Sequence, residues 1–284
     1  MQRTDGLSAP SDAAAAPVSK ALPRARLTWA APGLWAMLMI HVGALLALLP
    51  AARPTPAILW SALGSFTVRN FCVSAGFHRY FSHRAFRTHR VVQFLFAFIG
   101  GMAVMRSALW WAAQHRLHHR YADREGDPHG TLRGFWWAHC LWFIDAANQE
   151  TRLEELRDFA RYPELRWLER NEFVPIAVFV AACAALGGFA GWVWAANVST
   201  VLLCHATFAL NSVSHRFGPR RYATRDRSTN LLSIALLTFG EGWHNNHHRW
   251  PGRARLGEGW REVDLSWLGI RALARLGLVW GVRR

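Results

Sequence analysis

Cysteine is scarce in this sequence of 284 residues, and acidic residues are outnumbered by basic ones. The four cysteines, Cys72, Cys140, Cys183 and Cys204, have no paired spacing, and three of them lie in or beside long apolar segments. This pattern excludes a disulfide-stapled domain and a cysteine-ligated zinc site, so we expect packed thiols. The sequence also contains neither a CxxC pair nor an HPGG motif. We therefore expect no rubredoxin or b-type cytochrome domain within it.

The scarcity of acidic residues leaves a strong positive charge. Asp and Glu number 18 against 33 Lys and Arg, nearly all of them Arg, and the formal net charge is +15. Such an excess is typical of nucleic-acid-binding proteins, but here its distribution argues against nucleic acid. The arginines gather in residues 1–27, 78–172 and 216–284, which are separated by long runs almost free of charge. This alternation indicates a membrane protein.

Four apolar runs are long enough to cross a bilayer, whose core of about 30 Å requires about 20 residues of α-helix. They cover residues 29–50, 57–77, 173–194 and 196–215, and the second and fourth end in polar residues. The alternative is a soluble protein with four buried helices. A cleaved signal peptide at residues 29–52 is excluded, because its apolar core exceeds the usual length of about 7–15 residues and a second run follows immediately.

The arginine distribution also orients these runs. The first two are joined by AARPTPA, which has one arginine, and the last two are joined around residues 195–198, which carry no charge. By the positive-inside rule the arginine-rich segments and both termini lie in the cytoplasm. We predict an all-α integral membrane protein with a disordered tail at residues 1–27. One membrane domain at 28–284 then combines four transmembrane helices with a cytoplasmic helical cap, formed by 78–172 and 216–284.

Nine of the 14 histidines fall into three dense groups and one helix end, all on the predicted cytoplasmic side: His78 and His83; His115, His118 and His119; His215; His244, His247 and His248. Residues i, i+3 and i+4 of an α-helix share a face, so each HxxHH group can aim its rings at one point. Five residues cover about 140° beyond a full turn of an ideal helix, so the first pair converges only if the helix ends or bends. Neutral imidazole binds Zn, Cu, Fe and Ni. Because one ion takes about four to six ligands, two metal ions are the simplest interpretation.

Five histidines lie outside these groups. His41 and His205 stand alone in apolar runs, and His89 lies in an arginine-rich turn. Packing or surface roles are the simplest explanation for these three. His129 and His139 follow the second group closely, and a role in supporting the ligands or binding substrate stays open for both.

The order and spacing of the histidines resemble a known family. HRYFSH, HRLHH and EGWHNNHH resemble the three histidine boxes of membrane fatty acyl desaturases, especially the acyl-CoA delta-9 (stearoyl-CoA type) desaturases and their bacterial relatives. Agreement extends to WWAAQHRLHHRYADREGDPHG, RGFWWAHCLW, NSVSHRFG and LLTFGEGWHNNHHRWP, and covers roughly residues 30–280. The resemblance implies four spanning helices under a cytoplasmic cap, in agreement with the topology above, and a bacterial inner membrane.

The resemblance also implies a di-iron site. The family holds two non-haem irons with nine histidines, and an asparagine acts through a water. The matching positions are His78, His83, His115, His118, His119, Asn211, His215, His244, His247 and His248. Carboxylates that flank the boxes are candidates to accept the second ring N–H of the ligands, with pairing to nearby arginines as the alternative: Asp123, Glu125, Asp127 and Glu241.

The implied reaction is oxidative. Acid–base side chains cannot remove two hydrogens from an unactivated alkyl chain, because its C–H bonds are neither acidic nor polarised, so the irons and O₂ as co-substrate supply the oxidising power. The resemblance implies a cis double bond at delta-9 of a saturated acyl-CoA. The alternatives are a histidine-box hydroxylase, an acyl-lipid or acyl-carrier-protein desaturase, and a divalent-metal carrier. The DPH and EGWHNNHH contexts favour desaturation, and ligands at one cytoplasmic end argue against a carrier.

Substrate and electron partners complete the prediction. Trp111, in the same helical stretch as His115, is predicted to line a dry tunnel for the acyl chain, whereas other tryptophans near the boxes suit the membrane interface. Arg116 is predicted to pair with CoA phosphates, and the alternatives are Arg106, Arg133 and Arg170. Electrons are expected from a separate ferredoxin, rubredoxin or b-type cytochrome, because the basic cytoplasmic surface suits an acidic carrier. Membrane lipid is the remaining expected partner.

Overall fold

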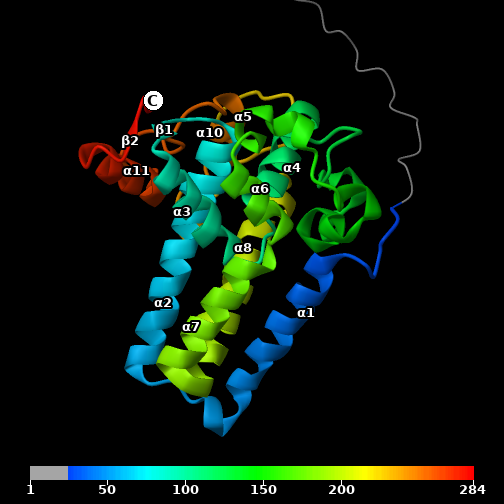
Figure 1. The fold of residues 1–284 in the computed structure, drawn as a ribbon. Helices are drawn as coiled ribbons and strands as arrows, with labels where there is room; N and C mark the ends of the chain where they lie inside the picture. The colour runs from blue at the N-terminus through cyan, green and yellow to red at the C-terminus, as the bar shows by residue number, and fades with distance from the viewer. Residues whose placement is uncertain (1–24) are drawn as a thin grey trace, which may run out of the picture.

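The computed structural model describes residues 25–284 and shows a bundle of helical rods below a broad cap (Figure 1). The predicted tail, residues 1–27, lies outside this range except for its last three residues, of which Arg26 accepts a backbone hydrogen bond from Ala146 (2.9 Å). The α-helices are α1 (Pro32–Leu45), α2 (Pro56–Phe71), α3 (Arg90–Gly101), α4 (Ala108–Tyr121), α5 (Arg157–Ala160), α6 (Pro163–Arg170), α7 (Phe173–Gly191), α8 (Ser199–Ser212), α9 (Leu232–Leu237), α10 (His244–Arg249) and α11 (Leu265–Arg275).

Shorter helical segments extend and connect these helices. The wider, π-helical ones are η3 (Cys72–Ser82), η5 (Trp137–Leu141) and η9 (Trp192–Val198). The tighter 3₁₀ turns are η1 (Leu46–Leu48), η2 (Pro50–Ala52), η4 (Thr131–Arg133), η6 (Trp142–Ile144), η7 (Ala146–Asn148) and η8 (Leu153–Leu156). Antiparallel strands β1 (Arg87–Thr88) and β2 (Val279–Trp280) tie the C-terminal segment to the cap.

Four rods form the bundle: α1, α2 continued by η3, α7, and η9 continued by α8 (Figure 1). Pro56 occupies the first turn of α2, where its missing N–H removes no helical hydrogen bond. Thr55 caps the same helix, because its Oγ1 accepts a hydrogen bond from the Ile58 N–H (3.3 Å). The rods expose large apolar side chains, including Met39, Trp60 and Leu186. Exposure of this kind suits a lipid environment.

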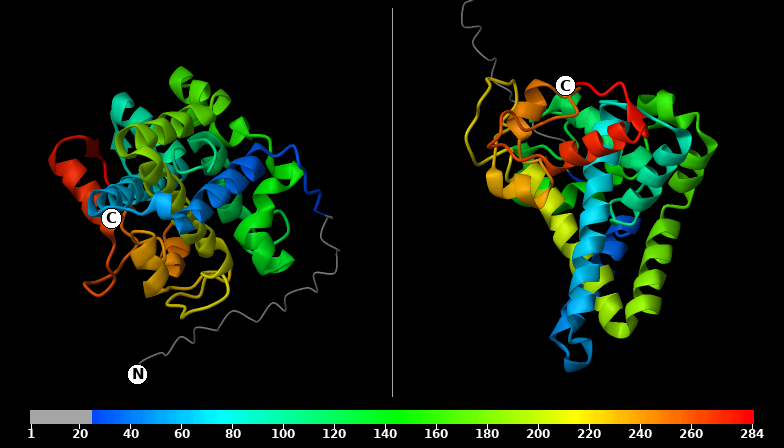
Figure 2. Two further views of the ribbon diagram at one scale, coloured as in Figure 1. Left: turned by 90° about the horizontal axis from the view of Figure 1, so that it is seen from below. Right: turned by 90° about the vertical axis from the view of Figure 1, so that its left-hand side faces the viewer.

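The third and fourth rods meet at a turn that differs from the predicted one. The sequence predicted spans at 173–194 and 196–215 joined around residues 195–198. In the structure the chain reverses at Gly188 (φ 58°, ψ −149°), so η9 already belongs to the returning rod (Figure 2). Hydropathy could not locate this turn, because both rods and the turn are uncharged and apolar. Glycine permits the positive φ that other residues rarely adopt.

The membrane prediction is confirmed in part. Within residues 25–284, Phe173–Ser212 is the one helical stretch long and apolar enough to cross a bilayer, and the chain doubles back inside it at Gly188. The other strongly apolar helices, Pro32–Leu48 and Arg90–Gly101, are shorter. The predicted second span is helical but contains buried Arg69 and Asn70. A predominantly helical architecture is therefore confirmed, but four transmembrane helices are not.

The cap is packed directly onto the second rod. Helices α3 and α4 both lie against η3, and buried side chains from these elements form one apolar core with α11: Phe77, Phe81, Leu109 and Ile270. Gly100 of α3 allows the Phe77 ring to approach its backbone, since a Cβ atom at this position would overlap the ring. This close packing fixes η3 relative to α4, and both carry predicted ligands.

A line of side chains outside the nine predicted ligands joins α1, α8 and η5. His41 Nε2 lies 3.0 Å from His205 Nε2, and His205 Nδ1 lies 2.9 Å from His139 Nε2. His139 Nδ1 lies 2.9 Å from the Ser212 hydroxyl, and His41 Nδ1 donates to the Met37 carbonyl (2.7 Å). Because the Met37 carbonyl can only accept, His41 carries its proton on Nδ1, and its Nε2 accepts a hydrogen bond from the Nε2–H of His205. His205 Nδ1 then accepts a hydrogen bond from the Nε2–H of His139. The three histidines therefore link the rods to the cap, as hydrogen-bonded rather than solvated side chains.

Candidate metal centre and adjoining cavity

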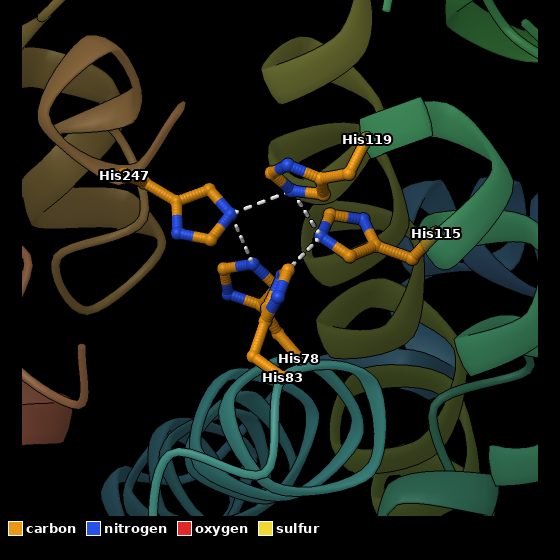
Figure 3. Close-up of side chains that lie close together, drawn as sticks. All are labelled: His78, His83, His115, His119 and His247. Atoms are coloured by element: carbon orange, nitrogen blue, oxygen red, sulfur yellow. Dashed lines mark hydrogen bonds between the residues drawn. The ribbon is translucent and has the colours of Figure 1, made fainter. Parts of the chain in front are cut away.

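The nine predicted histidines converge in two groups at the junction of bundle and cap. The ligand atoms within each group lie within 4.8 Å of one another. Figure 3 shows the first group, in which rings from η3, its C-terminal end, α4 and α10 point toward a common centre: His78, His83, His115, His119 and His247. The second group combines α4, α10 and the turn that follows α8: His118, His215, His244 and His248. Two metal sites are therefore geometrically available, with five and four imidazoles.

The π-helical winding of η3 brings the first pair together. His83 N–H donates to the His78 carbonyl five residues earlier (3.3 Å), a bond that closes a π-helical turn. Residues five apart then stand one above the other, and the two rings lie 4.9 Å apart between centroids. The helix also ends at Ser82, which is one of the two conditions under which the sequence allowed the pair to converge.

The HxxHH groups divide between the two sites, which corrects the prediction that each aims at one point. On α4, His115 and His119 belong to the first site and His118 to the second. Positions i and i+4 differ by about 40° around a helix, whereas i+3 and i+4 differ by about 100°. Helix α10 divides in the same way, with its middle histidine in the first site and the outer two in the second. Each short helix thereby spans both sites.

Carboxylates hold the outer nitrogen of several rings. Asp123 lies 2.7 Å from His215 Nδ1, and Asp127 lies 3.0 Å from His118 Nδ1. Glu241 Oε2 lies 2.5 Å from Nδ1 of His78. The structure thus places these three predicted carboxylates against ligand rings, where they hold ring orientation. The fourth, Glu125, is exposed.

The spacing of the inner nitrogens fits a bound metal. In the second site, three pairs of Nε2 atoms lie close together. The distance is 3.0 Å between His244 and His215, 3.1 Å between His244 and His248, and 3.3 Å between His248 and His118. Carboxylates accept the Nδ1–H of three of these rings, so their Nε2 atoms face one another as lone pairs. Lone pairs repel at this distance unless a cation lies between them. Ligand nitrogens about 2.1 Å from an ion, at right angles, lie about 3.0 Å apart.

The first site shows the same spacing. Its Nε2 atoms form a series in which neighbours lie 2.8–3.0 Å apart (Figure 3). The order of the series is His78, His247, His119, His115 and His83. Both donor sets consist of imidazole nitrogens, which suit Fe, Zn, Cu or Ni. The residues present therefore fit a two-metal centre.

Protonation states also suit metal binding. Burial lowers the pKa of His248 to about 4, although a nearby carboxylate opposes the shift. Burial alone would lower the pKa of His118, but the effect of the neighbouring Asp127 carboxylate is larger, so the pKa of His118 is raised. Burial alone would raise the pKa of Asp127 and Glu241, yet neighbouring positive charge holds each at about 2. Burial and the surrounding rings lower the pKa well below its usual value for five ligands: His83, His115, His119, His244 and His247. Most ligands are thus neutral and the carboxylates ionised, as metal binding requires.

A largely apolar cavity adjoins both sites. It encloses about 920 Å³, its open mouth included, and its lining includes His78, His115, His244 and Trp111. Trp111 stacks on His115, with ring centroids 5.0 Å apart and planes at 16°. Asn211 of α8 lines the same cavity. The structure therefore brings Trp111 and Asn211 to the wall of the same cavity as the predicted ligands.

Arg116 does not fit its predicted role as a phosphate partner. Its guanidinium donates to Asp158 (2.9 and 3.1 Å) and to the carbonyls of Phe81, Ser82 and Glu155 (2.7–3.0 Å). All five N–H donors are used within the cap. The sequence could not show this, because Arg116 follows His115 directly but points away from the site.

The other candidate arginines differ in their surroundings. Arg106 borders the cavity and pairs with Glu172 (2.8 Å). Arg133 lies 3.6 Å from Asp145, beside a second, polar pocket. Arg170 is exposed on α6. Among the four, Arg106 alone lines the cavity that reaches the histidines.

Two functional candidates were missed or left open by the sequence. Asp226 lies 3.1 Å from His248 Nδ1 and also accepts hydrogen bonds from Ser228 N–H and the Thr224 hydroxyl. It stands 22 residues before His248, so spacing gave no signal. His129 is buried, lines the cavity and stacks on His118 with centroids 4.3 Å apart. It therefore supports a ligand ring, one of the roles left open for it.

Comparison with known proteins decides the family. The sequence model described as "Fatty acid desaturase" matches residues 52–262, a range that includes all nine histidines. The chain belongs to the fatty acid desaturase family. This desaturase is accordingly an oxidoreductase of unsaturated fatty acid biosynthesis and, like its family, membrane-associated.

Three relatives show the range of substrates within similar sequences. The "sn-1 stearoyl-lipid 9-desaturase" of Anabaena variabilis is 36% identical over 246 residues, which cover 86% of this desaturase and 90% of the relative. The "Acyl-CoA C20 Delta5-desaturase" of Anemone leveillei is 38% identical over 216 residues, 75% of this chain and 69% of the relative. The "sn-2 palmitoyl-lipid 9-desaturase" of Nostoc sp. (strain 36) is 34% identical over 229 residues, 77% and 80%. Similarity at this level covers both lipid-linked and CoA-linked substrates.

Proposed function

We propose that the protein is an O₂-dependent di-iron desaturase that introduces a cis double bond at position 9 of a saturated fatty acyl chain. The observation that carries the proposal is the pair of inward-facing imidazole groups, five and four, that border an apolar cavity. Iron is proposed because the desaturation of an unactivated chain requires oxidising power from a redox metal and O₂. The position follows the printed names of the Anabaena and Nostoc relatives.

The protein's own residues position the reactants. The cavity carries the acyl chain past Trp111, whose ring also fixes His115 by stacking on it. Asn211 borders the same space and is proposed to act through a water at the second iron. Burial of the histidines keeps bulk water away from the reacting carbons.

The substrate head group is proposed to be either CoA or a glycerolipid, both of which present a long acyl ester or thioester. Loss of Arg116 as a phosphate partner removes one argument for CoA, while the relatives include enzymes named for each. We further propose a multi-pass protein of a bacterial inner membrane with both termini cytoplasmic, since its four rods lie on the side opposite the arginine-rich cap. A separate ferredoxin, rubredoxin or b-type cytochrome supplies electrons.

Product analysis tests the proposal. The wild-type protein and His119→Ala are expressed in a host that makes no monounsaturated fatty acids, and mass spectrometry locates any new double bond in lipid and CoA fractions. We expect a 9-unsaturated product from the wild type and at least about a hundredfold less from His119→Ala, because one iron site loses a ligand. Exposed His89 provides the matched control, and His89→Ala retains wild-type product.

The same measurement separates the alternatives. A hydroxylated chain would identify a hydroxylase and contradict desaturation. Normal unsaturated product from His119→Ala would contradict the di-iron assignment, and zinc transport without any oxidised product would support a metal carrier. Unsaturation confined to the lipid fraction or to the CoA fraction identifies the head group.

A further inference from the structure

The cavity beside the metal centre is buried at the histidines and reaches the surface elsewhere. The ligand rings in its wall, among them His78 and His244, are buried. Gly33, Arg106 and Phe143 also line it, and these three residues are partly exposed. They meet at one place, because a Cβ atom at Gly33 would lie 3.4 Å from the Phe143 ring and 3.9 Å from Arg106 Cδ. The cavity therefore has an opening where α1, η6 and the loop before α4 come together.

This opening lies at the level where the rods join the cap. Gly33 belongs to the first turn of α1, and Arg106 pairs with Glu172 (2.8 Å), the residue directly before α7. Both rods begin at the cap (Figure 1). Trp29 and Trp35, on either side of the first turn of α1, are exposed, and the Trp35 indole donates to the Trp29 carbonyl (2.8 Å). Exposed tryptophans are typical of the membrane interface, so the opening lies at the height of the lipid head groups.

Carboxylates neutralise the arginine at this opening. Glu172 binds the Arg106 guanidinium directly. Glu169 is a second carboxylate beside it, and accepts hydrogen bonds from the hydroxyls of Ser107, the neighbour of Arg106, and Thr151. Burial raises the pKa of Glu172, although Arg106 opposes the shift. Even where Glu172 is protonated, Glu169 balances the charge of Arg106.

The second, polar pocket has a balanced charge as well. Three arginines and three carboxylates line it: Arg124, Arg133, Arg152, Glu125, Asp127 and Asp145. Arg133 lies 3.6 Å from Asp145 and also lies over the Trp137 ring (4.4 Å). CoA carries a pyrophosphate and a phosphomonoester, and the phosphomonoester alone bears about 1.5–2 negative charges at pH 7. Such a group is bound best by arginines without carboxylate partners, which neither of these two pockets supplies.

We infer that the substrate is an acyl chain of a glycerolipid without net charge, and that the chain enters the cavity from the bilayer past Gly33 and Phe143. The inference rests on the proposed function, in which one saturated acyl chain, one O₂, two electrons and two protons give one unsaturated chain and two waters. The lipid head group stays at the membrane surface and requires no cluster of free cations. The phosphates of CoA would instead meet Glu169 and Glu172 beside a single arginine, and like charges placed together weaken binding.

The rate of a single turnover compares the substrates. Purified, metal-loaded protein is placed in nanodiscs of 1-stearoyl-2-oleoyl-phosphatidylcholine, of the anionic phosphatidylglycerol with the same chains, or of dioleoyl-phosphatidylcholine with stearoyl-CoA added. Dithionite supplies the electrons, O₂ starts the reaction, and mass spectrometry locates the new double bond. We expect the phosphatidylcholine to form 9-unsaturated product at least about tenfold faster than stearoyl-CoA, and also faster than the phosphatidylglycerol, since the carboxylates at the opening repel anionic groups.

Charge variants test the cause of this preference. Glu169→Gln/Glu172→Gln keeps an acceptor oxygen at each position but removes both negative charges. The rates with stearoyl-CoA and with the phosphatidylglycerol should therefore rise at least about threefold relative to the rate with the phosphatidylcholine. Glu172→Gln alone should change the ratio in the same direction. The matched control is Glu154→Gln, at an exposed position of η8, which should leave the ratio unchanged.

The ratio of rates is the deciding quantity, because a variant that only loosens the fold slows all three reactions together. A wild type that converts stearoyl-CoA as fast as the phosphatidylcholine would overturn the inference, and so would an unchanged ratio in the double variant. Absence of unsaturated product from all three substrates would instead contradict the proposed function.

Discussion

Single carboxylates decide how the imidazoles of this centre are held. Asp123, Asp127 and Asp226 each accept the Nδ1–H of a different histidine of the second site, at 2.7–3.1 Å. A carboxylate in this position fixes the tautomer and makes the opposite nitrogen a better ligand. The first site has one such contact, from Glu241 to His78. The second site therefore depends more strongly on its carboxylates.

Asp226→Asn tests this dependence. The amide retains an acceptor oxygen but loses the negative charge, so we expect metal affinity of the second site to fall about 10–100-fold while the first site is unaffected. Titration of the purified apoprotein with iron, followed by metal analysis, measures both sites. Glu125→Gln, an exposed carboxylate outside the site, should leave both affinities unchanged. Equal weakening of the two sites by Asp226→Asn would contradict the assignment.

The lowered pKa values of the histidines predict acid sensitivity of the metal-free protein. Histidines such as His244 and His247 stay neutral in the fold but protonate in the unfolded chain below a pH of about 6.5. The unfolded state then binds more protons, so stability falls as the pH drops from 7 to 5. His118, whose pKa is raised by the Asp127 carboxylate despite its burial, has the opposite effect.

Thermal unfolding of apoprotein between pH 7 and 5 measures this dependence. The carboxylates do not account for it, because those with a pKa of about 2, Asp127 and Glu241, remain ionised throughout this range. A midpoint temperature that rises toward pH 5 would show that the histidines are charged in the fold.

At the scale of elements, helix type decides which histidines meet. The sequence predicted the nine ligands and two metals from spacing alone, yet it placed each HxxHH group at one point. The structure divides both groups, because rings one residue apart point about 100° apart on α4 and α10. It also brings His78 and His83 together through π-helical winding, which residue types do not reveal. That these histidines converge was predictable from the sequence, but how they divide between two groups depends on backbone geometry.

The turn at Gly188 offers a test of the bundle. A Cβ atom at Gly188 would meet open space, but φ of 58° with ψ of −149° is accessible essentially to glycine alone. We expect Gly188→Ala to destabilise the folded protein by about 1–3 kcal/mol. Gly64 of α2 also faces open space, but has ordinary helical geometry, so Gly64→Ala should be neutral or stabilising. Thermal unfolding in detergent compares the stabilities of the two variants. If Gly188→Ala and Gly64→Ala changed the stability equally, a side chain at position 188 would not strain the turn.

For the whole molecule, the separation of an apolar bundle from an arginine-rich cap was predictable from composition along the chain. The positions of the rods followed from hydropathy, but the length of each and the turn between α7 and η9 did not, since apolar runs do not show where a chain reverses. Arg116 was misassigned and Asp226 missed for a related reason: both depend on contacts between distant segments. The cavity, which joins α1, α4 and α8, has the same origin.

The central claim is that the two histidine groups hold two irons side by side. Its most direct test is the metal content of the purified wild-type protein, together with Mössbauer spectra of protein grown on ⁵⁷Fe. We predict about two irons per chain in two distinguishable nitrogen-rich environments, because one site has five imidazoles and the other four. Protein that carries a single iron, or zinc in both sites while it forms unsaturated product, would contradict the account.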